Sequence, residues 1–258
     1  MSPMLKLEFE SRYSIKDKKA GLLEPSGLAL APDGSLWTVC DENRRLFQID
    51  KKGQVQKTLK IKNEGLEGIT FDAAGRICVV DEDVSQIIVY KPKKGKKFLK
   101  RRLKDLEGFT SIATHFEDID GNGLEGITFD SMHNELLLLK EADPGLLIAV
   151  SADLERITSV EVLDEQSGFT AEGKKIDFSG MCFDATRELL WILSEDARCV
   201  FIFDRRQTQV MQRLELKKKA CGRSIRFAEG IAVDRDSERL YVVSDDDAKL
   251  TVFRIVEC

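Results

Sequence analysis

The segment EGITFDAAGRICVVDEDVSQIIVYK, residues 67–91, carries the pattern that decides the fold. An acidic residue and a glycine open a short apolar strand, which is followed by an Asp-rich turn, a second apolar strand, an acidic tip and a third strand. The same order recurs at residues 26–50, 125–150, 179–204 and 229–255. Such self-similarity indicates repeated units that pack on their neighbours. The anchor glycines, 41, 58, 54 and 50 residues apart, are Gly27, Gly68, Gly126, Gly180 and Gly230.

Each copy predicts a three-stranded antiparallel meander. Runs such as LWTVC (residues 36–40) and LYVVS (residues 240–244) are too short for a buried helix and suit a strand covered on both faces. The intervening turns are rich in Asp, Gly, Ser and Asn, which tolerate tight-turn geometry. A fourth strand is expected where sequence remains, for example at residues 53–61 and 207–216. Four-stranded sheets repeated around an axis are the blades of an all-β, five-bladed β-propeller.

The two ends of the sequence predict how the ring closes. The fifth copy stops after its third strand, whereas residues 5–15 (LKLEFESRYSI) form a strand without a partner in sequence. Pairing these two strands would complete the last blade and remove two exposed edges. We therefore expect one β-propeller domain over residues 1–258. A sixth blade without an anchor glycine would have to lie at residues 92–122, and we favour five.

Acidic residues occupy two recurrent positions in the copies. One directly precedes the anchor glycine, where the five copies have Ser26, Glu67, Glu125, Ser179 and Glu229. The other ends the second strand, 14 residues after the glycine in two copies and 15 in three, at Asp41, Glu82, Glu141, Glu195 and Asp245. A turn one residue longer in the last three copies explains this slip. Antiparallel strands return to the same end of a blade, so these acids should converge on one mouth of the central channel.

Converging carboxylates must raise their pKa values, spread into solvent or bind a cation. Oxygen ligands without a nearby His or Cys select a hard ion, and a wide, flexible ring suits calcium better than magnesium. The candidate calcium ligands are Glu67, Glu82, Glu125, Glu141, Glu229 and Asp245. The alternative is that these acids only solvate the surface, because the tips are rich enough in acids to place one there by chance.

The glycine series, with its preceding Ser or Glu, and the acidic strand tips resemble the SdiA-regulated family of bacterial proteins, distant relatives of the NHL-repeat propellers. The similarity extends from about Glu24 to Ile255. It implies a five-bladed propeller with calcium at the channel. By position, Glu67, Glu125 and Glu229 would be the inner acids, with Glu82 and Glu141 as their tip partners. Family members often carry an amino-terminal membrane anchor, which this sequence does not contain.

Composition narrows the class of protein. A net charge of −5 and a pI near 5.4 argue against a dedicated nucleic-acid binder. No secretion signal and no apolar run of about 18 residues is present, which favours a cytoplasmic location, or a periplasmic or membrane-anchored one if an amino-terminal segment was removed. The six scattered cysteines indicate reduced structural thiols, and His115 and His133 lack partners at zinc-ligand spacing. We expect a monomer.

Two further segments have alternative interpretations. Residues 118–126 (DIDGNGLEG) begin like an EF-hand loop, but Phe129 stands where its terminal glutamate should be, which favours a plain turn over a second small calcium loop. The run KPKKGKKFLKRR, residues 91–102, has eight basic residues. It suits a solvated loop and an outer edge strand protected by lysines. The alternative is a contact for anionic lipid, nucleic acid or an acidic partner.

Two functions fit these observations. The favoured one is a calcium-stabilised binding or scaffold module, with a protein or small-molecule partner at the channel mouth. The alternative is a calcium-dependent hydrolase of an ester, lactone or phosphoester, with the channel metal as Lewis acid. That second function rests on analogy with other propellers. The inner positions offer Ser26 and Ser179, where such enzymes usually add a His or an Asn at the metal.

Overall fold

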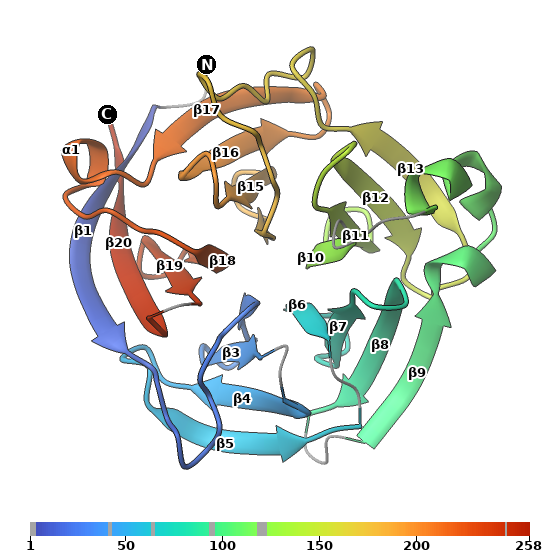
Figure 1. Cartoon of the computed structure of the whole chain (residues 1–258), viewed down its shortest axis with the longest axis horizontal. Helices are drawn as coiled ribbons and strands as arrows, with labels where there is room; N and C mark the ends of the chain where they lie inside the picture. The colour runs from blue at the N-terminus through green and yellow to red at the C-terminus, as the bar shows by residue number, and fades with distance from the viewer. Residues whose placement is uncertain (1–3, 41–42, 63–64, 93–95, 118–122, 246) are drawn as a thin grey trace.

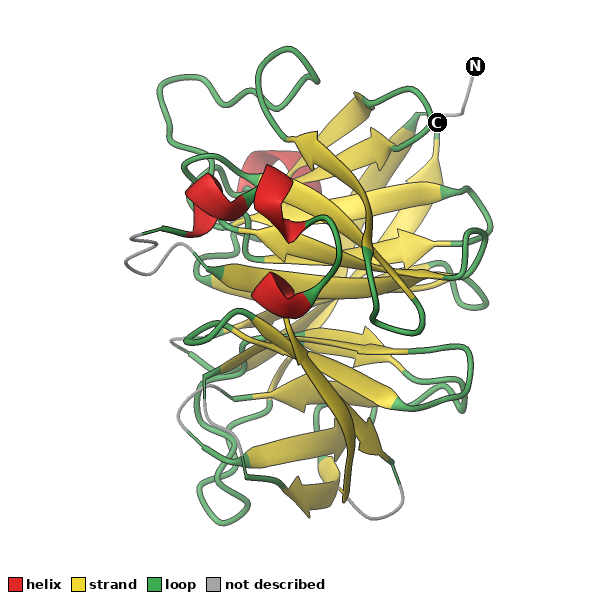
Figure 2. Cartoon of the chain, turned by 90° about the vertical axis from the view of Figure 1, so that its right-hand side faces the viewer, coloured by secondary structure: helices red, strands yellow, loops and turns green. Residues whose placement is uncertain are grey.

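A computed structural model describes residues 4–40, 43–62, 65–92, 96–117, 123–245 and 247–258. Within these residues the chain forms five four-stranded antiparallel sheets. The sheets are arranged around a central axis, with their first strands innermost (Figure 1). Seen from the side, the strands run between loops that gather at the two faces of the ring (Figure 2). The predicted five-bladed β-propeller is therefore confirmed.

The blades follow one another along the chain. Blade 1 contains β2 (Leu28–Leu30), β3 (Leu36–Val39), β4 (Arg45–Ile49) and β5 (Val55–Lys60). Blade 2 contains β6 (Leu66–Phe71), β7 (Ile77–Asp81), β8 (Gln86–Lys91) and β9 (Lys96–Arg102). Blade 3 contains β10 (Leu124–Asp130), β11 (Glu135–Lys140), β12 (Leu146–Ser151) and β13 (Ile157–Val162). Blade 4 contains β14 (Gly180–Asp184), β15 (Leu189–Ser194), β16 (Cys199–Asp204) and β17 (Gln209–Glu215). Blade 5 contains β18 (Ala228–Asp234), β19 (Arg239–Ser244), β20 (Lys249–Glu257) and β1 (Leu5–Ser14).

The last blade closes as the sequence predicts. Strand β1 pairs antiparallel with β20, from Leu5 opposite Glu257 to Ser14 opposite Lys249, with one bulge between Phe9 and Ser11. The two strands lie side by side at the outer edge of blade 5 (Figure 1). Residues from the start and end of the ring are thus joined by a full ladder of hydrogen bonds.

Short helical turns occupy the connections. Three 3-10 turns follow β9, namely η1 (Leu103–Asp105), η2 (Phe109–Ser111) and η3 (Ala113–Phe116), and one α-helical turn, α1 (Lys218–Cys221), follows β17. The described part of residues 92–122 therefore contains β9 and these turns, not a sixth blade. Among the described residues, no helix has both the length and the apolar character needed to cross a membrane.

The core consists of five apolar clusters, one between each pair of neighbouring blades. Trp191 of β15, for example, is fully buried with Ile231 of β18 and Leu7 of β1 in the cluster between blades 4 and 5. Continuous apolar runs on the middle strands supply both faces of a blade, which explains why they are not amphipathic. The six cysteines, all in described residues, form no disulfide.

The inner strands approach one another at their glycines. A Cβ added to Gly27 would lie 2.3 Å from the Glu67 carbonyl oxygen, and one added to Gly230 would lie 2.5 Å from the Leu28 nitrogen. Gly68 and Gly180 meet the backbone of the next blade at similar distances. The space lined by this glycine ring is only about 10 Å³, close to the minimum for one water molecule. Because the anchor glycines have no side chains, the inner strands can approach one another and the ring can close. The channel is narrowest at these glycines.

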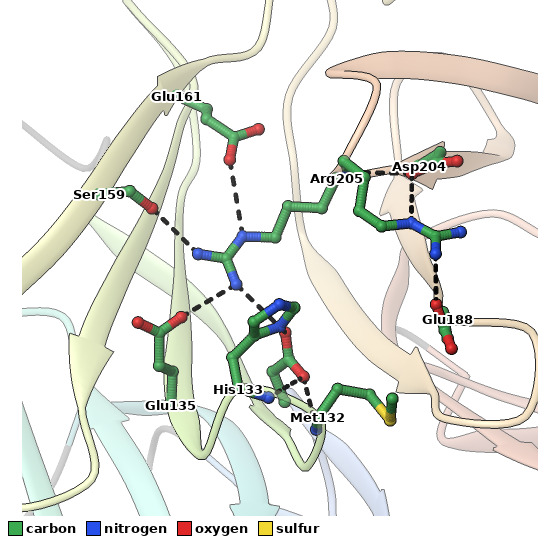
Figure 3. A network of polar contacts seen from close by, with 10 residues as sticks. Met132, His133, Glu135, Ser159, Glu161, Glu188, Asp204 and Arg205 are labelled. Carbon is green, nitrogen blue, oxygen red and sulfur yellow. Dashed lines mark hydrogen bonds and ion pairs between the residues drawn. The ribbon is translucent and has the colours of Figure 1, made fainter.

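A polar link also joins neighbouring blades. Arg205, in the turn between β16 and β17, reaches across to blade 3, where its guanidinium donates to Glu135 Oε2 at 3.0 Å (Figure 3). The same guanidinium donates to Asp130 Oδ2 at 3.1 Å. It also donates to Ser159 Oγ at 3.0 Å and lies 3.5 Å from Glu161. Arg205 thus ties blade 4 to blade 3 at the carboxyl ends of the inner strands.

Candidate metal centre

The three inner glutamates all lie at β-bulges. The pairing of each inner strand with its neighbour shifts register at Glu67 in blade 2, Glu125 in blade 3 and Glu229 in blade 5. Strands β14 and β2, which follow Ser179 and Ser26, pair without such a shift. A bulge leaves one residue outside the ladder and turns its side chain. The same irregularity therefore accompanies all three inner carboxylates.

The described tip acids occupy equivalent places directly after the second strand of each blade. The backbone N–H of Glu82 donates to Gly65 O at 3.0 Å, that of Glu141 to Gly123 O at 3.1 Å, and that of Asp245 to Phe227 O at 2.9 Å. In each case the acceptor lies two residues before the inner glutamate. This repeated hydrogen bond holds a tip acid beside an inner acid.

The turn between the first two strands is one residue longer in blades 3 to 5, as the sequence spacing predicts. Asp41 lies outside the described residues, as do residues 118–122 of the EF-hand-like segment.

Glu82, Glu125 and Glu141 form the tightest acidic group in the described part of the chain. One carboxylate oxygen from each lies within 4.8 Å of those of the other two, and all three side chains are partly buried. Glu82 comes from blade 2, whereas Glu125 and Glu141 come from blade 3. The Gly123 N–H donates to Glu82 Oε1 at 3.2 Å, and a Cβ at Gly123 would lie 2.4 Å from Glu82 Cγ. Gly123 is therefore required for this close approach.

Repulsion and burial act together on these carboxyl groups. The pKa of Glu125 is raised well above its ordinary value by burial and then by the charges of Glu67, Glu82, Glu229 and Glu141. Burial raises the pKa of Glu141 to about 7, with help from Asp177 and Glu82. The protein thus holds acids that are costly to ionise unless a cation is present.

The remaining predicted ligands are linked to this trio through their charges. Burial raises the pKa of Glu229 to about 9, and Glu195, Glu67 and Asp245 add to the rise. Glu67, Glu229 and Asp245 are thus part of one electrostatic system, although they lie outside the tight group.

Asp177 acts on this system and was missed by sequence reasoning. Its charge raises the pKa of both Glu141 and Glu229. It accepts hydrogen bonds from Ser194 Oγ at 3.0 Å and the Asp196 N–H at 2.9 Å. Asp177 stands two residues before Ser179, at the offset of Gly65, Gly123 and Phe227 in other blades. Extending the aligned copies two residues upstream, to Glu24, Gly65, Gly123, Asp177 and Phe227, would have included it.

The serines and histidines have other roles. Ser179 Oγ donates to Ala228 O of blade 5 at 2.7 Å, so its hydroxyl links blades. His133 pairs with Asp130 at 2.8 Å, at the far end of β10 from Glu125, and His115 lies in η3. Within the described residues, the acidic group therefore contains carboxylates alone.

Without a cation, the free energy of unfolding should fall as the pH rises from about 5 to 9. In the folded protein Glu229 keeps its proton up to a pKa of about 9, whereas in the unfolded chain it ionises near 4.5. The stabilisation that Glu229 contributes is therefore complete below its pKa in the unfolded chain and is lost as the pH approaches its pKa in the folded protein. At about 1.4 kcal/mol per pH unit, the total loss amounts to several kcal/mol. Urea unfolding of chelator-treated protein would measure this, and Glu229→Gln should flatten the slope. A stability independent of pH would contradict it.

Comparison with solved structures confirms the shared architecture. The glutaminyl cyclase of Myxococcus xanthus is 12% identical, with a TM-score of 0.71 and 100% of both chains covered. The gluconolactonase XC5397 of Xanthomonas campestris is 12% identical, with a TM-score of 0.59, 99% of this chain and 96% of that one covered. The β-propeller domain of Myceliophteria thermophila Cps50 (Swd1) is 11% identical, with a TM-score of 0.56, 97% of this chain and 100% of that one covered.

At such low identity these likenesses show the fold alone. The repeated glycines, the acidic tips and the five closed blades carry more information about relationship, because they extend over nearly the whole sequence. A family model described as SdiA-regulated matches residues 8–248, and the chain belongs to the SdiA-regulated family.

Proposed function

We propose that the protein binds one calcium ion at the acidic mouth and serves as a binding module for a protein or small molecule there. The observation that carries this proposal is the trio of Glu82, Glu125 and Glu141, with carboxylate oxygens within 4.8 Å of one another. Oxygens that ligate calcium at 2.3–2.6 Å lie at most about 5 Å apart, so the spacing fits. The donor set contains only oxygen, as a hard cation prefers.

The proposed ion would act mainly on stability and on the shape of the mouth. Its charge would offset the repulsion that raises the pKa of Glu125, and it would join Glu82 of blade 2 to Glu125 and Glu141 of blade 3. Glu67, Glu229 and Asp245 would complete the negative surroundings. The loops around a stabilised mouth form a rigid platform for recognition.

Isothermal titration of the chelator-treated protein with calcium tests the binding directly. We expect one site that prefers calcium to magnesium, and we expect Glu125→Gln to weaken it by at least about tenfold, because ligand charge is a main determinant of calcium affinity. Glu155→Gln is the matched control, since Glu155 is exposed in the turn between β12 and β13, at the opposite end of blade 3. A protein that takes up no calcium, or that loses nothing in Glu125→Gln, would refute the site.

A calcium-dependent hydrolase of an ester, lactone or phosphoester is the second candidate. Two of the proteins that share this fold are named as enzymes, one of them a gluconolactonase. Glu141, with a pKa raised to about 7 and a place in the trio, offers a carboxyl group that exchanges protons near neutral pH. A bound calcium would supply a Lewis acid. Turnover of ester, lactone or phosphoester substrates that needs calcium and disappears in Glu125→Gln would favour the enzyme over the binding module.

A further inference from the structure

The channel has a second mouth, opposite the acids, and its wall repeats from blade to blade. The third residue after each anchor glycine is apolar and only partly buried in all five blades: Leu30, Phe71, Phe129, Phe183 and Val233. These five side chains, the apolar collar, line a cavity of about 340 Å³ at the carboxyl ends of the inner strands. Pockets that hold small ligands have such volumes, and their walls combine apolar side chains with polar groups, as this one does.

Packing fixes the collar without covering it. Each of its members packs against a different one of the five inter-blade clusters, with its remaining surface turned to the cavity. Phe71, for example, meets Trp37 edge to face, with ring centroids 6.0 Å apart. The apolar surface exposed in the cavity is therefore preorganised, and an apolar ligand could cover it with little loss of side-chain freedom.

The cavity ends blindly at the glycine ring. The space lined by Gly27, Gly68, Gly126, Gly180 and Gly230 is about 10 Å³, too narrow for anything larger than a water molecule. A molecule in the collar cavity cannot pass to the acidic mouth. The two mouths are thus separate sites, and a ligand at one of them needs no calcium ion at the other.

The polar groups of the cavity limit the charge of its ligand. Asp184 lies 3.2 Å from Arg187, and Asp234 lies 2.5 Å from Lys51, so both buried carboxylates are already compensated. Arg235 at the rim pairs with Glu238 at 2.6 Å, and Asp236, which also lines the cavity, is exposed. A charged ligand would lose its hydration deep in the cavity, where each buried carboxylate already pairs with a cationic side chain. The free energy of that lost hydration would therefore not be recovered.

Hydroxyl groups offer polar contacts inside the wall. Thr128 lines the cavity, and its Oγ1 accepts a hydrogen bond from the Phe183 N–H at 3.0 Å. That bond leaves the proton of the Thr128 hydroxyl to be donated. Thr70 stands at the same position in blade 2 and also lines the cavity. The wall therefore favours a ligand that carries a hydrogen-bond acceptor.

We propose that the apolar collar binds an uncharged aromatic molecule of up to two rings with one hydrogen-bond acceptor. The volume sets the size, because a cavity of about 150 Å³ holds one benzene and this one is about twice as large. The three phenyl rings of the collar would contact its faces and edges.

The test uses 6-propionyl-2-(dimethylamino)naphthalene, a neutral two-ring dye with a carbonyl acceptor and polarity-dependent emission. We expect saturable one-to-one binding with a blue shift. Val233→Trp, which fills the cavity, and Phe129→Ala, which removes part of its wall, should each weaken binding by about tenfold or more. Phe98→Ala is the control, because Phe98 is 49% exposed on β9, away from the cavity. The affinity of the Phe98→Ala protein for the dye should stay within about twofold of that of the wild type.

Val233→Trp reduces the volume of the cavity, whereas Phe129→Ala increases it. If circular dichroism shows that one of these variants does not fold, the other still tests the proposal. Absence of saturable binding to the wild-type protein would overturn the proposal. So would an affinity in a folded Val233→Trp or Phe129→Ala protein equal to that of the wild type, since the dye would then sit elsewhere.

Discussion

Calcium should raise the melting temperature of the chelator-treated protein by about 5–10 °C, and Glu125→Gln should remove most of this rise. A ligand bound only by the folded state adds about 2.7 kcal/mol at a hundred times its dissociation constant. In a chain of this size 1 kcal/mol corresponds to about 2–4 °C. Glu125 is the member of the acidic trio on which four other glutamates act, so its loss should remove the largest share of the effect. Differential scanning calorimetry with and without calcium would measure it.

The same variant should have the opposite effect without calcium. At pH 8 the burial and neighbouring charges that raise the pKa of Glu125 destabilise the fold, because the unfolded chain ionises this group freely. Glutamine does not titrate, so chelator-treated Glu125→Gln should be more stable than the wild type at this pH. Glu155→Gln should follow the wild type in both conditions. A variant that is less stable than the wild type in chelator would mean that Glu125 supports the fold through contacts other than a cation.

Gly230→Ala should destabilise the protein more than an ordinary surface substitution, by on the order of 3 kcal/mol or more. The added methyl group would lie 2.5 Å from the Leu28 nitrogen and 2.6 Å from the Gly27 carbonyl carbon, both of them backbone atoms of blade 1. Neither atom can move without displacing an inner strand, so the ring would have to open at the contact of blades 5 and 1. Urea unfolding would give the change in free energy.

Gly34→Ala is the matched control for this substitution. Gly34 lies in the turn before β3 with φ of +80°, and a Cβ there meets nothing within 4 Å. Only the cost of a positive φ remains, about 1 kcal/mol. If the two variants lost equal stability, the close packing of the glycine ring would not be what the anchor glycines provide.

The blades could be predicted from the sequence because each blade repeats the same short pattern of residues. Gly68 and its counterparts mark the inner strands, and the Asp-rich turns mark the first hairpins, so the number of blades follows from counting. The difference between Glu82 and Glu141 in their distance from the glycine also predicts the longer turn of the later blades. Closure by residues 5–15 follows from the missing strand of the last copy.

The selection among the acids could not be predicted, because it depends on how strands pair within a blade and on contacts between blades. The bulge at Glu125 arises from the pairing of β10 with β11 inside blade 3, and no residue pattern in the sequence indicates it. Glu82 reaches Glu125 because Gly123 leaves room, a contact between residues 41 positions apart. The collar was missed for a similar reason: Phe71 and Phe129 look like ordinary strand residues until the strands stand around one axis.

The pairing of β1 with β20 determines the order in which the protein can be completed during its synthesis. Strand β1 emerges from the ribosome before all other strands, and its partner emerges after them. Until the last blade has been synthesised, the apolar side chains of β1, such as Leu5 and Leu7, cannot pack in the cluster that buries them in the folded protein. Contacts of such large sequence separation slow folding and leave intermediates open to aggregation. Blades 1 to 4 contain only strands that are consecutive in the chain, whereas the pairing of β1 with β20 can form only after β20 has been made.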